Sequence, residues 1–294
     1  MKVKGIGINA HPEHTAGEIA KLEQDLTFFQ STGYDYVELP ADAIDVLRCG
    51  RLAPSQLGEI KALLSELDLK YTVHAPGALD LRDVNNLETQ KELFRACIEF
   101  TSEIGAEIFV YHYGQKARDP QLEDVHHRGM LAMADYAESC GVRICVENIE
   151  IDTVANTVDF VRRVERESVG MTLDLGHAYL ASVRFGFDFL ESVLLAKPYV
   201  QHIHVQDNFG RFEELRLAGY DQYKLIPYRR LLALGKGDLH LPPGWGRVPL
   251  DAALALLGDY EGVFMLEYHY QRYRPQAREI LEAARGYVER HSSP

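Results

Sequence analysis

The sequence predicts an α/β protein that folds as a single (β/α)8 TIM barrel over residues 1–294. Three observations favour this fold. The chain has 294 residues, close to the roughly 250 that are typical of such barrels. Short β-rich runs alternate along it with segments of helical periodicity. Eight strand candidates can be counted, and the glycine motifs GxGxxG and GxxxxGK[ST], which would point to an open doubly wound sheet, do not occur.

The strand candidates are short runs rich in β-branched and aromatic residues. In chain order they are Lys4–Asn9, Tyr36–Leu39, Tyr71–His74, Ile108–His112, Arg143–Glu147, Met171–Asp174, Val200–His204 and Val263–Glu267. Apolar residues at helical spacing fall between most of them. The clearest sets are Ile19, Leu22, Leu26 and Phe29; Leu93, Cys97, Phe100 and Ile104; and Ala277, Ile280, Leu281, Ala284 and Val288.

One connection is too long for an ordinary loop after a barrel strand. Between His204 and Asp238 lie 33 residues, where such loops are usually short. Residues 209–236 of it are locally basic, with six Lys and Arg against three Asp and Glu, and they contain three tyrosines. We expect residues 209–236 to form an inserted loop that acts as a lid at the C-terminal mouth of the barrel.

Composition and charge exclude several classes of partner. The formal net charge is −13, so the chain repels nucleic acid and anionic lipid at long range. No apolar run approaches the ~20 residues of a membrane span. The four cysteines form no CxxC pair, as expected of reduced thiols in the cytosol. These features predict a cytoplasmic protein whose partners include neither nucleic acid nor a membrane; the oligomeric state stays open.

Six consecutive strand candidates end in a residue that can bind a metal ion. In chain order these residues are His74, His112, Glu147, Asp174 (with His177 one turn further on), His204 and Glu267. Asp238 and His240 follow the insertion, and residues two apart on an extended segment point the same way. Because barrel enzymes build their sites at the C-terminal ends of the strands, these groups are expected to converge. Imidazole and carboxylate are ligands for zinc or manganese.

Other polar residues are assigned more local roles. Tyr113 and His269 lie just past predicted ligands, and Arg229, Arg230 and Arg247 are placed to meet an anion, so all five are candidate substrate contacts. His202 lies one layer deeper than His204 and is expected to be a packed core residue. Asp207 either orients a ligand or caps a loop. His126 and His127 open a helix and are expected at the surface.

These residues resemble a known family. Over essentially its whole length the chain looks like the xylose isomerase-like superfamily of TIM barrels, and its ligand set resembles that of endonuclease IV, which carries three zinc ions. The resemblance implies a first zinc at His74, His112 and Glu147. It implies a second at Glu147, Asp174, His204 and Glu267. It implies a third at His177, Asp238 and His240.

Part of the pattern departs from endonuclease IV. Gly77 stands where that family has a tyrosine that stacks into DNA, and the loop after His240 reads Gly244-Trp245-Gly246 rather than GEG. These changes argue against DNA repair. The four-residue core of Glu147, Asp174, His204 and Glu267 also resembles the single-metal site of sugar isomerases and epimerases in the same superfamily.

Charge counting separates two enzymatic interpretations. Three Zn²⁺ ions with four carboxylates leave about +2, which suits a phosphate ester attacked by a metal-activated nucleophile. One divalent ion with three carboxylates leaves about −1, which suits a neutral polyol. The extra ligands favour the first: a metal-dependent hydrolase of a phosphate ester or phosphodiester, with two or three zinc ions (manganese is possible) and a small anionic phosphate- or sugar-containing substrate. The alternative is a single-metal sugar or sugar-phosphate isomerase or epimerase, with Glu147 and Glu267 as the catalytic acid/base pair. A barrel that only binds a small molecule ranks last.

Overall fold

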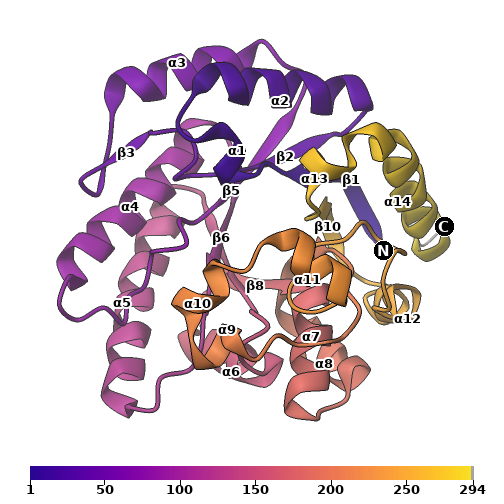
Figure 1. Ribbon diagram of the computed structural model, residues 1–294. Coiled ribbons are helices and arrows are strands. Elements are labelled where there is room, and N and C mark those ends of the chain that lie inside the picture. The colour runs from indigo at the N-terminus through magenta and orange to yellow at the C-terminus, as the bar shows by residue number, and fades with distance from the viewer. Residues whose placement is uncertain (293–294) are drawn as a thin grey trace.

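The eight predicted strands close into a parallel barrel in the computed structural model, which describes residues 1–292. Around the barrel the order is β1-β10-β9-β8-β7-β6-β5-β2, so the first strand closes against the last (Figure 1). The bounds are β1 (Lys2–Asn9), β2 (Tyr36–Pro40), β5 (Lys70–His74), β6 (Ile108–His112), β7 (Arg143–Glu147), β8 (Val169–Asp174), β9 (Val200–Val205) and β10 (Glu261–Leu266). The predicted TIM barrel is therefore confirmed, with strand ends shifted by two residues at most.

Helices surround the barrel and connect its strands (Figure 1). The larger ones are α2 (Ile19–Thr32), α3 (Pro54–Ser65), α4 (Leu87–Glu103), α5 (Pro120–Ser139), α6 (Val154–Val164), α7 (Leu175–Phe185), α8 (Phe189–Ala196), α12 (Leu250–Leu256) and α14 (Ala277–His291). Short turns are α1 (Pro12–Thr15), α13 (Tyr270–Tyr273) and the 3₁₀ segments Lys197–Tyr199 and Arg274–Gln276. The two chain ends lie close together, where the Met1 amino group donates to the His291 carbonyl at 2.5 Å.

Burial on both faces explains why the strands read as apolar runs rather than as alternating patterns. All six residues of β8 are buried, as expected of a parallel strand covered by side chains inside the barrel and by helices outside. Helix α14 shows the complementary pattern, since it buries Ile280, Leu281 and Ala284 on one stripe. The polar residues that interrupt these buried runs at the strand ends are therefore the exceptions that need a reason.

The long connection after β9 contains three short helices, drawn in orange in Figure 1. They are α9 (Leu215–Ala218), α10 (Tyr220–Lys224) and α11 (Tyr228–Leu234). A small apolar cluster around Leu231, Leu239 and Leu241 packs this segment against the residues that follow it and against Tyr273 of α13. The structure also contains a short antiparallel hairpin, β3 (Leu47–Arg48) with β4 (Arg51–Leu52). Its two-residue strands are too short for any periodicity, so the sequence did not predict it.

Within residues 1–292, no helix combines the length and the apolar character needed to cross a bilayer.

Candidate metal centre at the barrel mouth

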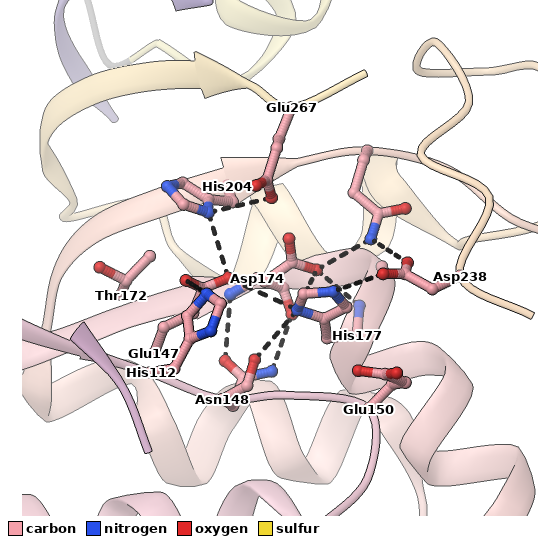
Figure 2. A network of polar contacts seen from close by, with 12 residues as sticks. His112, Glu147, Asn148, Glu150, Thr172, Asp174, His177, His204, Asp238 and Glu267 are labelled. Atoms are coloured by element: carbon pink, nitrogen blue, oxygen red, sulfur yellow. Dashed lines mark hydrogen bonds and ion pairs between the residues drawn. The ribbon is translucent and has the colours of Figure 1, made fainter. Parts of the chain in front are cut away.

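The parallel strands bring the predicted ligands to one rim. His74, His112, Glu147 and Asp174 are the last residues of β5, β6, β7 and β8, His204 is the penultimate residue of β9, and Glu267 directly follows β10. Strand register places His112 beside Glu147 and Asp174 beside His204. All nine predicted ligands fall into three groups whose potential ligand atoms lie within 4.8 Å of one another. Figure 2 shows most of them pointing toward a common centre.

The central group consists of Glu147, Asp174, His204 and Glu267. Two carboxylates meet at one imidazole nitrogen, because His204 Nδ1 lies 3.2 Å from Glu147 Oε1 and 3.1 Å from Glu267 Oε2. Asp174 Oδ2 and Glu267 Oε2 are buried and have no hydrogen-bond partner among the described residues. A buried oxygen without a donor is costly, so the donor set fits a bound divalent cation.

The opposite nitrogen of His204 faces a carboxylate that the sequence analysis missed. Glu38, on β2, is fully buried, and its Oε1 lies 3.0 Å from His204 Nε2. Thr72 and Asn9 each donate to Glu38 at 2.9 Å. This arrangement fixes the imidazole with Nδ1 toward the central group, as the outer partners of metal-binding histidines do. A lone glutamate inside the apolar run of β2 was the signal that could have revealed it.

One flanking group lies on the β5–β6 side of the centre. His74 Nδ1 faces the Ala75 carbonyl at 2.8 Å, so its Nε2 is the free ligand atom. That Nε2 lies 3.0 Å from His112 Nε2, and each of the two nitrogens lies 3.3 Å from Glu147 Oε2. Two imidazole nitrogens and one carboxylate oxygen thus point at a shared space, which is the chemistry of a zinc-type donor set.

The second flanking group combines His177, Asp238 and His240. Both histidines direct Nδ1 to a backbone carbonyl, of Asn148 at 3.2 Å and of Glu267 at 2.8 Å. Their Nε2 atoms lie 3.1 Å and 2.8 Å from Asp238 Oδ2. Here too the backbone fixes the tautomer and presents the second nitrogen to the cavity.

Two loops hold this second group. Asp174 accepts a hydrogen bond from the His177 backbone N–H at the start of α7, an N-cap that fixes the DLGH turn. His240 is held at φ +41°, a strained conformation of the kind that clusters at functional sites. The following loop is anchored by Asp207, which accepts backbone N–H bonds from Gly244, Gly246 and Val248. Asp207 therefore caps a loop. A Cβ on Gly246 would lie 2.3 Å from Asp207 Oδ1, so glycine is needed there.

Burial makes this cluster compete strongly for positive charge. Burial, opposed by His177 and reinforced by Glu267 and Glu147, raises the pKa of Asp174 to about 8. Burial also disfavours the charged forms of Glu267 and His240, but neighbouring groups of opposite charge outweigh this effect of burial. The histidines His204 and His240 lower the pKa of Glu267 to about 2, and Asp238 with Glu267 raises the pKa of His240 to about 10. Carboxylates this close in a dry site cannot all ionise without cations beside them.

The remaining predicted site residues are more dispersed. His269 lines the mouth cavity, which has a volume of about 270 Å³, and burial with the nearby His240 and His11 lowers its pKa to about 3. Tyr113 is buried and donates to Glu123 rather than facing the cavity. Arg229, Arg230 and Arg247 are exposed and lie outside the cavity wall. The wall instead contains Glu150 and Arg216, which sequence reasoning did not select.

Residues 26–290 match the family model described as xylose isomerase-like TIM barrel. The chain belongs to this family. One family relative, the inosose isomerase of Bacillus licheniformis, is 24% identical over 286 residues, covering 93% of each chain. A protein of Methanocaldococcus jannaschii is 24% identical over 248 residues, covering 79% of this chain and 75% of that one. Among solved structures, a D-tagatose 3-epimerase-like protein superposes with a TM-score of 0.71 at 19% identity, covering 97% of this chain and 98% of that one.

The expectation of phosphate-ester hydrolysis is wrong. Similar proteins whose names state an activity include D-psicose 3-epimerase, L-ribulose 3-epimerase and inosose isomerase, which are sugar epimerases and isomerases. The physical reason lies in the cavity wall, where the carboxylates of Asp42 and Glu150, which the charge count left out, outnumber the one guanidinium that residues 1–292 place there, that of Arg216. The extra ligand-type residues had been given more weight than this surrounding charge. The endonuclease IV ligand assignment stays a prediction.

Proposed function

We propose that this chain is a metal-dependent isomerase or epimerase of a small sugar or related polyol. The observation that carries the proposal is the convergence of Glu147 and Glu267 on His204 Nδ1, at 3.2 Å and 3.1 Å. Glu267 lines a cavity of about 270 Å³, and Glu147 contacts three histidines of the same cavity wall, His74, His112 and His177. This geometry allows both to reach a substrate carbon from different strands.

The central group is where we place the resident cation. Glu147, Asp174, His204 and Glu267 supply three carboxylates and one imidazole, and two of their buried oxygens have no hydrogen-bond partner among residues 1–292. When bound, a divalent ion would polarise the substrate carbonyl as a Lewis acid. A zinc-bound structure of the IOLI protein (TM-score 0.64, 19% identity) and a magnesium complex from Mycobacterium smegmatis (0.67, 18%) support a divalent metal.

Glu147 and Glu267 then move the proton. One carboxylate accepts the proton from the carbon beside the carbonyl, and the electron pair of the broken C–H bond passes to the carbonyl oxygen as an enediolate. In an epimerase the other carboxyl enters the step protonated and donates to the opposite face of the same carbon, and both groups exchange protons with solvent before the next turnover. In an isomerase a proton is returned to the former carbonyl carbon, while the proton of the neighbouring hydroxyl moves to the former carbonyl oxygen. No oxidant is needed, since the substrate and product are isomers. Asn9 donates to Glu267 Oε1 at 3.5 Å and helps to orient it.

The number of ions is a finer part of the same proposal. The two flanking groups offer donor sets for further cations, with histidine tautomers fixed by the carbonyls of Ala75, Asn148 and Glu267. We infer that turnover requires the central ion, and that ions bound by the flanking groups add to the metal content. Elemental analysis of protein purified without chelator measures this number directly.

The proposal is tested by exchange at carbon. Metal-loaded protein is incubated in deuterium oxide with neutral ketohexoses and an inosose, and products are followed by NMR. We expect one isomeric product that carries deuterium on a carbon beside the carbonyl. Chelator treatment should lower the rate at least 100-fold, and added Mn²⁺, Zn²⁺ or Mg²⁺ should restore it. Fully loaded protein that exchanges no carbon-bound hydrogen in any of these substrates would contradict the proposal, as would full turnover after verified metal removal.

A further inference from the structure

The insertion between β9 and Asp238 contributes one arginine to the wall of the mouth cavity. Arg216, on α9, donates from Nε to Glu150 Oε1 at 2.5 Å. Its guanidinium lies 4.7 Å from the ring centroid of Tyr220 and 5.6 Å from that of Tyr223. Glu150 lies three residues after Glu147, and Figure 2 places it on the same side of the network as Asp238 and His177. The pair therefore joins the insertion to the barrel inside the cavity wall.

Each member of this pair has hydrogen-bonding capacity to spare. Glu150 is 2% exposed, and its Oε2 has no hydrogen-bond partner among the described residues. Of the five guanidinium N–H donors of Arg216, the bonds within the described chain use only the one on Nε. Both side chains line the cavity. A buried acceptor beside unused donors is arranged for a ligand group that both donates and accepts, and a hydroxyl group does this.

Charge decides between a neutral ligand and an anionic one. Besides the candidate metal ligands Asp238 and Glu267, the cavity wall carries the carboxylates of Asp42 and Glu150, and among residues 1–292 Arg216 is the one Lys or Arg side chain in it. Glu150 already balances the charge of Arg216 at 2.5 Å. A phosphate bound to this pair would meet no net positive charge from it, and Asp42, which is not a candidate metal ligand, adds a further carboxylate to the same wall. A neutral polyol avoids this repulsion and satisfies Glu150 Oε2 with its own O–H.

We propose that Glu150 and Arg216 form the specificity site for the hydroxyl-bearing end of an unphosphorylated substrate, and that they reject its phosphorylated counterpart. The inference rests on the proposed function and adds the substrate class to it. The bound hydroxyl oxygen accepts from the guanidinium, and its hydrogen is donated to Glu150 Oε2. Because Arg216 belongs to the insertion, the same contact links substrate binding to this segment, while the reacting carbons lie at the central group.

The test measures binding apart from turnover. Dissociation constants of the metal-loaded protein are determined by NMR titration for D-tagatose, its 6-phosphate and its 6-deoxy analogue. We expect the neutral sugar to bind at least 10-fold more tightly than the phosphate. Arg216→Gln should weaken binding of the neutral sugar about 10-fold or more, as expected when a charged hydrogen-bond donor is lost. Arg216→Lys, which keeps the charge but loses the planar fork, should fall in between.

Glu150→Gln sharpens the comparison because it removes a negative charge at nearly constant shape. It should narrow the preference for the neutral sugar over the phosphate, and it should bind the neutral sugar and the 6-deoxy analogue almost equally. Lys236→Gln serves as the matched control, since Lys236 is a basic residue of the same insertion that pairs with Glu213 at 3.9 Å and lies outside the cavity wall. Its three dissociation constants should equal those of the wild type.

The outcomes separate this inference from the proposed function. If the wild type binds the 6-phosphate more tightly and Arg216→Gln abolishes that preference, Arg216 anchors an anion and the inference is wrong, even where carbon exchange proceeds. If the neutral sugar binds through the pair but no carbon exchange occurs, the proposed function fails and the inference stands. If folded, metal-loaded protein binds none of these ligands, the inference is also rejected.

Discussion

The two ends of the barrel hold cavities that differ both in volume and in how deeply their charged groups are buried. The cavity at the N-terminal end of the strands is the larger, at about 640 Å³ against about 270 Å³ at the mouth. Its charged groups include Lys61 and Arg143, which pair with Glu103 at 2.6 Å and Glu107 at 3.3 Å and are all 43–68% exposed. At the mouth, Glu147, Asp174 and His204 are completely buried and converge. Desolvation, not cavity volume, marks the place where chemistry can occur.

This contrast follows from the cost of removing charge from water. Exposed ion pairs contribute little to stability, about 0–1 kcal/mol each, and tolerate substitution. Buried carboxylates must find protons, hydrogen-bond donors or cations. The base of the barrel can therefore vary in sequence with small effects, whereas each mouth residue depends on its neighbours. The geometry at the mouth is expected to respond to single-atom changes that have little effect at the base.

The largest expected effect comes from making the same Glu→Gln substitution at each end of the barrel and comparing the turnover of the two variants. Glu267→Gln replaces one oxygen at the mouth, and Glu107→Gln makes the same change at the base. Because Glu267 is proposed to move a proton, we expect its variant to lose on the order of 10³-fold in kcat, while the Glu107 variant keeps wild-type turnover. Steady-state kinetics with metal content measured in parallel decides this. Equal turnover in fully loaded Glu267→Gln would remove Glu267 from the acid/base pair.

Glu38 extends the comparison to a buried carboxylate that lies one layer below the mouth. It contacts His204 Nε2 at 3.0 Å but lies on the far side of the imidazole from the central group, so we treat it as a positioning residue. Glu38→Gln should weaken metal affinity and activity by about 10–100-fold, as is typical of such outer partners. Metal affinity is read by competition with a chelating dye, which a general loss of stability does not mimic.

A second buried carboxylate supplies the control for Glu38. Glu123 accepts from Arg82 Nε at 2.7 Å, away from the central group. Glu123→Gln leaves the Arg82 charge without its partner and should lower the free energy of unfolding by about 3–5 kcal/mol, with metal affinity unchanged. If the Glu38 and Glu123 variants both lose stability but neither loses metal affinity, Glu38 has only a structural role.

The strand ends could be predicted from sequence because two local facts combine there. Each of β5, β6, β7 and β8 ends in a ligand-type residue. Because parallel strands in a closed barrel share one rim, residues at the ends of different strands lie close together in space. Glu150 and Arg216 escaped prediction because their pairing joins segments 66 residues apart. No periodicity encodes such a contact. The exposed Arg229 and Arg230 were selected for charge alone, which does not show where a side chain points.

Helix α5 buries two polar residues that hydrophobic patterning did not reveal. His126 was expected at the surface and is wholly buried. The inner face of the helix runs through Glu123, His126, Met130 and Met133, which keeps helical spacing. Two of its members are polar, so the stripe did not read as apolar. Both are paired within the core, Glu123 with Arg82 and His126 Nε2 with the Tyr111 hydroxyl at 3.1 Å, although His126 Nδ1 has no hydrogen-bond partner among the described residues. Burial of paired polar groups is the case that hydrophobic patterning alone misses.

The smallest expected effect concerns His126 and the pH dependence of stability. Its ring stacks on Phe160 with centroids 4.2 Å apart, and burial, helped by Arg82 and His127, holds its pKa well below the usual range. The unfolded chain binds a proton near pH 6.5 and the folded chain does not. Stability is therefore full above this pH and falls as the pH drops below it, by about 1.4 kcal/mol from this one group by pH 5.5.

The other histidines also titrate, so the test is a difference between variants. His126→Leu removes the protonation site and keeps an apolar side chain. Urea unfolding at pH 7.5 and pH 5.5 should show that the wild type loses about 1.4 kcal/mol more than this variant over the interval. Met130→Leu, a substitution on the same buried face with no titrating group, should give no such difference from the wild type. If His126→Leu loses as much stability as the wild type, His126 is protonated in the folded chain, and burial at this site is balanced by a partner. Burial alone would then not predict which charged groups the core excludes, because a protonated imidazole would be stable beside the rings of Phe160 and Tyr113.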